Sequence, residues 1–233
     1  MPTQLFTDAQ DIAAIEILRH SAGQTIGAWS QHPKFSTDSS VSELLTLFGD
    51  RQLSRADLLQ LGVGARAGTS SNYRHLLAAT FICGSTKIDG RGYASDVLAS
   101  VRPPISSLNT LGRGSDLQSL YLELAIGGTN HIDHFGESFF TKYLYFLHAS
   151  NSIVRPAMPL ILDARVKRTL GGQQSTFCNT RLTSDGWHWT PRRKSGVAHY
   201  VEYCESVQSW SATLTAAGCR VAPDQIERYL FGR

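Results

Sequence analysis

The chain has 233 residues, of which 42% are hydrophobic and 18% charged, and its formal net charge is +3. This composition is typical of a globular protein with a sizeable core, in one domain or in two small lobes around a cleft. The sequence contains no apolar run of about 18 residues and no signal-peptide pattern at its N-terminus, so neither a membrane span nor secretion is expected.

Helices account for most of the first hundred residues. The segment 7–18 predicts an amphipathic helix whose buried stripe includes Ile12, Ile15, Ile17 and Leu18, and 21–38 predicts a loop. Further helices are expected over 41–48, 54–61, 72–83 and 94–101, with a flexible segment over 62–71.

The second half continues in the same way. Helices are expected over 116–126 and 138–148, from residue 163 onward, and over 196–217 and 223–231. The stretch 176–189 fits either a short hairpin or an irregular loop. The sequence therefore predicts an all-α fold.

Four cysteines are scattered along the chain, and their spacing fits neither a zinc ribbon nor a disulfide framework. They are Cys83, Cys178, Cys204 and Cys219. Reduced thiols of this kind predict a cytoplasmic protein.

The segment 131–170 carries most of the functional information. Gly136 ends a short apolar turn and permits close approach of the backbone, and the helix after it offers free amides to an anion such as a phosphate. Asp163 follows three apolar residues and precedes a basic helix, at the position of an N-cap. Residues 151–200 contain eight Lys/Arg and two Asp, so positive charge is concentrated around Asp163. Such a cluster fits either a solvated face or a surface for a polyanion.

This segment resembles the helix-hairpin-helix DNA glycosylases. Ile132, Phe135 and Gly136 occupy the apolar and glycine positions of that hairpin, and the Asp163 helix start matches the family's Asp-x-His-Val-x-Arg, with Arg165 in place of His. The hairpin Pro-Gly is replaced by Asp133-His134.

The closest resemblance is to the bacterial 8-oxoguanine glycosylase-fold proteins, through Gly136-Glu-Ser-Phe-Phe-Thr-Lys142. It implies a helix-hairpin-helix glycosylase fold with two helical lobes around a cleft. Within a single unit, 1–70 would form an N-terminal helical part and 72–233 the core, with the hairpin at 131–142.

The resemblance also implies catalytic roles. Asp163 would stabilise the positive charge that builds on the sugar as a base leaves, or activate a water; the plain alternative is an N-cap without chemistry. Because the usual lysine position of bifunctional members falls on Ser138, the strand-cleaving lyase role would belong to Lys142 or be absent. Lys142 could instead be a surface lysine that contacts phosphate.

DNA contacts follow from the same resemblance. The amides of Gly136, Glu137 and Ser138 would clamp a phosphate, and Arg165 and Arg168 would add positive charge beside it. Phe81-Ile-Cys-Gly-Ser85 is similar to a motif of the eukaryotic 8-oxoguanine glycosylases, which would place Thr86, with Lys87 beside it, in the gap left by the extruded base. A surface turn is the alternative.

Aromatic side chains are expected to wall the base pocket. The candidates are Trp187, Tyr203 and Trp210, although Tyr203 and Trp210 also fit simple core positions. No cofactor is expected, apart from a Na⁺ or K⁺ ion that the carbonyls of Ile132 and Phe135 could hold in the hairpin. The pair His131 and His134 lacks a third metal ligand and better fits a surface position.

The leading hypothesis is a DNA glycosylase that flips out a damaged or modified base of double-stranded DNA and cleaves its N-glycosidic bond. The base would be an oxidised guanine in base-excision repair, or a hypermodified phage base such as glucosylated hydroxymethylcytosine in antiviral defence. A non-enzymatic helix-hairpin-helix DNA-binding protein is the main alternative, and a small-molecule hydrolase is a third. No required protein partner is evident.

Overall fold

The structure, a computed structural model, describes residues 2–21, 23–68, 70–89, 93–101, 114–149, 154, 156–171 and 196–232. Within these ranges the chain forms twelve helices and no strand, which confirms the all-α prediction. None of the described helices is long and apolar enough to cross a membrane. The helices are α1 (Thr3–Thr7), α2 (Ala9–Ala13), α3 (Ile26–Ser30), α4 (Ser39–Phe48), α5 (Arg55–Ala67), α6 (Ser70–Gly84), α7 (Tyr93–Ser100), α8 (Leu117–Leu124), α9 (Glu137–His148), α10 (Ala164–Gly171), α11 (Val197–Ala216) and α12 (Pro223–Gly232).

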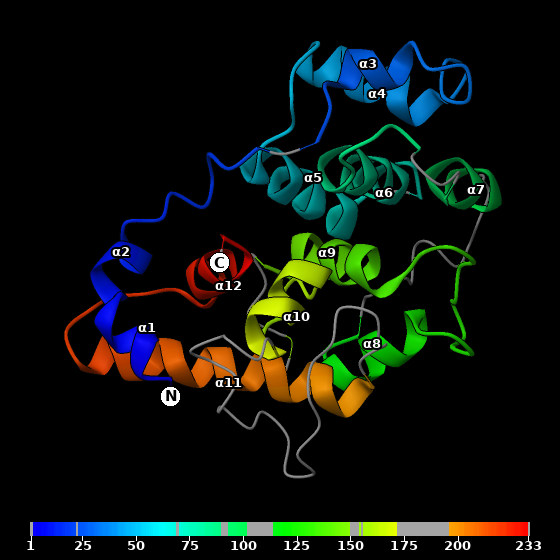
Figure 1. The fold of residues 1–233 in the computed structure, drawn as a ribbon. Coiled ribbons are helices and arrows are strands. Elements are labelled where there is room, and N and C mark those ends of the chain that lie inside the picture. The colour runs from blue at the N-terminus through cyan, green and yellow to red at the C-terminus, as the bar shows by residue number, and fades with distance from the viewer. Residues whose placement is uncertain are drawn as a thin grey trace.

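The helices form two groups that meet on α9 (Figure 1). The first lobe consists of α3 to α7, with α5 and α6 packed directly on α9. The second lobe consists of α1, α2, α8, α10, α11 and α12, and α8 contacts α9 from this side. Helix α9 therefore lies between the two lobes and contacts both of them.

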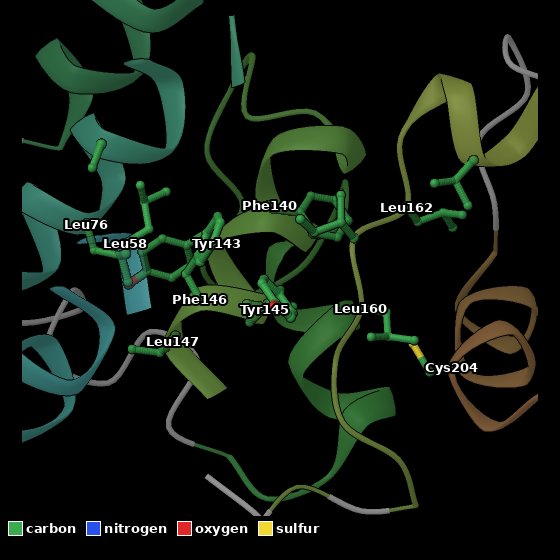
Figure 2. Close-up of a cluster of buried hydrophobic side chains, with 14 of the residues drawn as sticks. Leu58, Leu76, Phe140, Tyr143, Tyr145, Phe146, Leu147, Leu160, Leu162 and Cys204 are labelled. Carbon is green, nitrogen blue, oxygen red and sulfur yellow. The ribbon is translucent and has the colours of Figure 1, made fainter. Parts of the chain in front are cut away.

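One continuous apolar core runs across this junction. Figure 2 shows Leu58 of α5 and Leu76 of α6 facing Tyr143 of α9, while Leu160 and Cys204 lie on the opposite side. Every residue of α9 from Phe140 to His148 except Lys142 is buried. Lys142 is only partly buried because its side chain lines a cavity between the lobes.

Helix caps explain where several helices begin. Ser54 and Asp57 form a capping box at the start of α5, and Asp38, Asp116 and Asp163 accept amide hydrogens at the starts of α4, α8 and α10. The cap of Asp163 was predicted from the sequence.

The N-terminal prediction was wrong in detail. The expected helix 7–18 is replaced by α1 and α2, and the chain leaves helical geometry after Ala14. Ile12 is buried, as expected, but Leu18 lies beyond the helix and is 57% exposed. The expected loop 21–38 contains the short helix α3, which buries Trp29 completely, and α5 continues through most of the segment expected to be flexible.

The first two helices belong to the second lobe. The amide of Gln225 on α12 donates to the carbonyl oxygens of Ala13 and Ile15, and the hydroxyl of Tyr229 donates to Asp8. The thiol of Cys219 donates to the carbonyl oxygen of Ala9 (3.2 Å). Helices α1 and α2 thus pack against α12 and the residues just before it. The helices of the first lobe, α3 to α7, lie between these two parts in the sequence.

Candidate active site

The hairpin between α8 and α9 has the geometry that its sequence suggested. His134 occupies the position of the family's first hairpin glycine and adopts a left-handed backbone (φ 66°), as a glycine would. Its ring stacks on Tyr93 with 4.9 Å between centroids. Gly136 is the N-cap of α9, and the amides of Glu137 and Ser138 have no acceptor among the described residues. These amides remain available to an anion.

The side chain of Glu137 has a different task from its amide. The hydroxyl of Tyr121 donates to one carboxylate oxygen (2.6 Å), and Lys167 of α10 pairs with the other. The hydroxyl of Thr141 donates to the carbonyl oxygen of Glu137 and accepts the amide of Leu162. These contacts fix the start of α9 against α10 and so position Asp163 relative to Lys142.

A cavity of about 350 Å³ lies where the two lobes meet, within the range of about 300–1,000 Å³ typical of small-molecule pockets. Its lining comes from α5 and α6 of the first lobe, from α9, and from the start of α10 and from α12 of the second lobe. Six ionisable side chains reach it besides a histidine, and four of them are cationic: Arg55, Lys142, Arg165 and Arg228, with Asp163 and Glu227 as the acids.

Asp163 uses its two carboxylate oxygens differently. Oδ1 accepts the amides of Arg165 (2.9 Å) and Val166 (3.1 Å), so Asp163 is the N-cap of α10. Oδ2 lies 3.8 Å from Nζ of Lys142. The residue is 7% exposed, and the exposed part faces the cavity. The capping role is therefore compatible with a second, chemical role for Oδ2.

The side chain of Lys142 extends from α9 into the cavity. Its ammonium lies 5.5 Å from the ring centroid of Phe139, and its stem passes Gly84, where an added Cβ would lie 3.4 Å from Cδ of Lys142 and 3.1 Å from Phe139. The 3.8 Å separation from Asp163 is longer than a hydrogen bond. The amine is held near the carboxylate without being directly bonded to it.

A second ion pair closes the inner wall of the cavity. Nη2 of Arg55 donates to Oε2 of Glu227 (2.7 Å), and both side chains are almost completely buried. Burial alone would lower the pKa of Arg55, but the charge of Glu227, the nearby Tyr145 and hydrogen bonding to both together outweigh it, and the pKa is raised. Burial raises the pKa of Glu227 in spite of Arg55, with a smaller contribution from the charge of Asp163. Sequence reasoning missed both residues.

Two arginines flank an aromatic ring at the second-lobe side of the cavity. Arg165 and Arg228 lie 4.8 and 5.0 Å from the ring centroid of Phe231. Nearby, burial, with help from Arg228 and Arg55, lowers the pKa of His20 to about 4, so His20 is neutral at physiological pH. The fixed charge of this wall is therefore carried by the arginines.

Thr86 and Lys87 lie at the rim on the first-lobe side. Both are exposed, and Thr86 lines the main cavity as well as a neighbouring one that also contacts Lys87 and Phe139. Gln24 holds this turn by donating to the carbonyl oxygen of Thr86 (3.0 Å). Arg168 is exposed on α10 but does not line the cavity.

The predicted aromatic pocket differs from the described cavity. Tyr203 is fully buried and its hydroxyl donates to the carbonyl oxygen of Ile161 (3.1 Å), while Trp210 packs in the core of the second lobe. Neither lines the cavity, so both correspond to the core alternative. The nearest aromatic walls are Phe146 and Phe231. Trp187 lies outside the described residues.

The hairpin carbonyls were expected to suit an alkali ion. The oxygen of Ile132 accepts the amide of Phe135 (3.1 Å) and keeps its second lone pair, which could serve as one ligand of such an ion. His131 and His134 lie near Asp133 and Asp96 respectively, and the described residues contain no group of three His, Cys, Asp or Glu suited to a metal.

One of three comparisons with known proteins gives a match. A family model described as "putative 8-oxoguanine DNA glycosylase OGG-like protein" matches residues 17–231, which includes every residue that lines the cavity. No curated protein and no solved structure gives a significant match. The family match extends over nearly the whole chain, and the chain therefore belongs to the family described as putative 8-oxoguanine DNA glycosylase OGG-like proteins.

Proposed function

We propose that the protein flips a damaged or modified base out of double-stranded DNA and cleaves its N-glycosidic bond in the cavity between the lobes. The observation that carries this proposal is the placement of the Lys142 amine 3.8 Å from Oδ2 of Asp163, in a cavity large enough for a base. An amine and a carboxylate at this separation can both reach one sugar carbon.

Asp163 supplies the negative charge. As the glycosidic bond breaks, the base leaves with the bonding electrons and the sugar becomes cationic. Oδ2 of Asp163 stabilises this cation, while the amides at the start of α10 hold Oδ1 and fix the direction of the carboxylate. The helix cap thus gives the catalytic oxygen a fixed orientation.

Lys142 supplies a nucleophile. Its amine, after giving a proton to Asp163 or to water, forms a bond to the sugar carbon that the base has left. Opening of the sugar ring then gives a Schiff base, from which the 3′ phosphate can be eliminated with loss of a sugar proton. Without attack by Lys142, water completes a simple hydrolysis and the strand remains intact.

The DNA backbone is held outside the cavity. The free amides of Glu137 and Ser138 bind one phosphate, Arg165 and Arg168 bind others, and Thr86 with Lys87 enters the gap in the stack. An alkali ion held by the carbonyls of Ile132 and Phe135 would add positive charge beside the first phosphate.

The base itself is the finer part of the proposal. Oxidised guanine would place the protein in base-excision repair, and a hypermodified phage pyrimidine would place it in antiviral defence. Base release should be measured on duplexes that contain 8-oxoguanine, uracil, alkylated bases or glucosylated hydroxymethylcytosine. Each substrate should also be incubated with borohydride, which traps a Schiff base covalently.

The key variants are Asp163→Asn and Lys142→Ala. We expect Asp163→Asn to lower base release about a hundredfold or more while DNA binding persists, and Lys142→Ala to abolish the trapped adduct. Matched controls are Asp116→Asn, which alters another helix cap, and Lys34→Ala, which breaks a Lys–Asp pair (2.8 Å) in the first lobe. Neither control should change release.

Other outcomes identify the alternatives. Absence of release from every substrate by the unmutated protein, with salt-sensitive DNA binding, would support a non-enzymatic DNA-binding protein. DNA binding that is weak and insensitive to salt would favour a small-molecule hydrolase instead. Release without a trapped adduct would leave a hydrolytic glycosylase that depends on Asp163 alone.

A further inference from the structure

The Arg55–Glu227 pair leaves one guanidinium nitrogen and one carboxylate oxygen without a hydrogen-bond partner in the described part of the chain. Only Nη2 and Oε2 are joined; Nη1 of Arg55 and Oε1 of Glu227 are buried and have no hydrogen-bond partner among the described residues. Buried donors and acceptors are normally paired, because water can no longer solvate them. One unused donor and one unused acceptor therefore belong to the same salt bridge.

Another buried ion pair, Arg74–Asp38, is arranged differently. Nη2 of Arg74 donates to Asp38 (2.5 Å), and its Nη1 donates to the carbonyl oxygens of Leu98 and Val101. The other carboxylate oxygen of Asp38 caps α4. This pair uses both terminal guanidinium nitrogens and both carboxylate oxygens, as expected of a structural ion pair. The Arg55–Glu227 pair does not.

The location of the pair supplies a reason. Arg55 at the start of α5 and Glu227 on α12 come from opposite lobes and line the same cavity as Lys142 and Asp163. A nucleotide whose sugar lies at Lys142 and Asp163 would extend its base toward another part of the cavity wall. The charge of Asp163 acts on Glu227, so the two sites lie within electrostatic reach of each other.

We propose that Arg55 and Glu227 recognise the edge of the flipped base: Nη1 of Arg55 donates to an acceptor on the base, and Oε1 of Glu227 accepts an adjacent N–H. This inference rests on the proposed glycosylase function and narrows its substrate. The pair selects bases in which a carbonyl oxygen adjoins a ring N–H, the arrangement found in guanine, in oxidised guanine and in uracil. A guanidinium favours a carbonyl oxygen, as in arginine–guanine contacts, and a carboxylate can accept only from a donor.

The test separates recognition from chemistry. Binding should be measured by gel shift with uncleavable duplexes that contain 2′-fluoroguanosine or its O6-methyl ether, which lacks both the N1–H and the only carbonyl of the base. Uracil and N3-methyluracil form a second pair of probes. We expect the wild type to prefer the unmethylated member of at least one pair by about ten- to a hundredfold.

Two variants address the pair directly. Glu227→Gln can turn its amide oxygen toward Arg55 and present an N–H₂ donor in place of the free acceptor, so the preference should fall to about twofold or reverse. Arg55→Met/Glu227→Met replaces the ion pair by apolar side chains of similar length, a change that folded proteins often tolerate, and should also abolish the preference. Asp38→Asn, at the satisfied pair, is the matched control and should keep it.

The chemistry of Lys142 supplies an independent reading. Borohydride trapping on DNA with a preformed abasic site requires no base, so the ratio of 8-oxoguanine or uracil release to abasic-site trapping should fall in Glu227→Gln relative to the wild type. A wild type that prefers the unmethylated bases but releases none would overturn the proposed function and leave this inference standing. Release of bases with equal binding of both members in each pair, or a preference unchanged in both variants, would overturn this inference alone.

Discussion

Two ion pairs line one cavity, and they are built in opposite ways. Arg55 and Glu227 are joined by a direct hydrogen bond of 2.7 Å and are almost fully buried. Lys142 and Asp163 lie 3.8 Å apart, beyond hydrogen-bond distance, and both retain some exposure to the cavity. The first pair holds two helices from different lobes together, and the second leaves its amine and its carboxylate oxygen accessible.

The two pairs show that an ion pair can either stabilise the fold or leave its charged groups accessible to a ligand. A buried charge depends on its partner, because it cannot be solvated once the partner is removed. Asp163 does not depend on Lys142 in this way, since two backbone amides already hold Oδ1. The proposed catalytic pair can therefore exchange protons and bonds without loss of the fold, whereas removal of one member of the Arg55–Glu227 pair leaves the other charge buried and unpaired.

The largest expected effect is on stability at the tight pair. Glu227→Ala leaves Arg55 buried without a counter-charge and should lower the free energy of unfolding by about 3–5 kcal/mol. Lys142→Met should lower it by about 1 kcal/mol or less, because the amine makes no direct hydrogen bond to Asp163. Urea denaturation of both variants measures the difference. Equal losses would refute the contrast between the two pairs.

The next effect separates the two oxygens of Asp163. Asparagine caps helices about as well as aspartate, so Asp163→Asn should unfold close to the wild type and yet fail to release bases. Asp163→Ala loses the cap as well and should cost about a further 1 kcal/mol of stability. If both variants were destabilised equally, the carboxylate charge rather than the cap would be what stabilises α10.

His20 reports the electrostatics at the Arg55 side of the cavity. Its pKa of about 4 in the folded protein lies below the value of about 6.5 expected in the unfolded chain. The unfolded state therefore takes up a proton first, and the stability contributed by neutral His20 is complete above pH 6.5 and declines as pH falls toward 4. NMR titration should give the low pKa directly. His20→Gln should flatten the stability profile over this range, and a pKa near 6.5 would contradict the buried, cationic surroundings.

The smallest effect concerns the passage of Lys142 beside Gly84. A Cβ at position 84 would press on the ring of Phe139 and lie close to the lysine stem, both of which can move slightly. Gly84→Ala should therefore change stability by under about 1 kcal/mol but slow borohydride trapping several-fold, since small displacements of a nucleophile are costly. An unchanged trapping rate would show that the stem is not confined there.

Much of the helical order and one end of the site could be predicted from the sequence. Asp163 stood out because a buried apolar run, an N-cap position and a basic helix follow one another within a few residues. Local signals of this kind act over one or two turns of helix and survive without knowledge of the tertiary structure.

The other end of the site depends on contacts that no local pattern encodes. Arg55 and Glu227 are separated by 172 residues, and Arg55 reads as an ordinary first-turn residue after the Ser54 cap. A weak signal existed at Glu227, which lies three and four residues before Leu230 and Phe231 and so shares their inward face. The prediction for Leu18 was wrong for the opposite reason. A local helical spacing was present, but the helix ends before Leu18 and the side chain is exposed.

The contacts of α1 and α2 with α12 and the residues just before it also affect the order in which the protein folds. The contacts from Cys219 to Ala9 and from Tyr229 to Asp8 span 210 and 221 residues, whereas α3 to α7 are neighbours along the chain. Local contacts form faster than distant ones, so during synthesis the first lobe can pack while α1 and α2 still lack their partners. Of the described helices α12 is synthesised last, and it carries Glu227 to Arg55, so the cavity between the lobes cannot form until α12 packs.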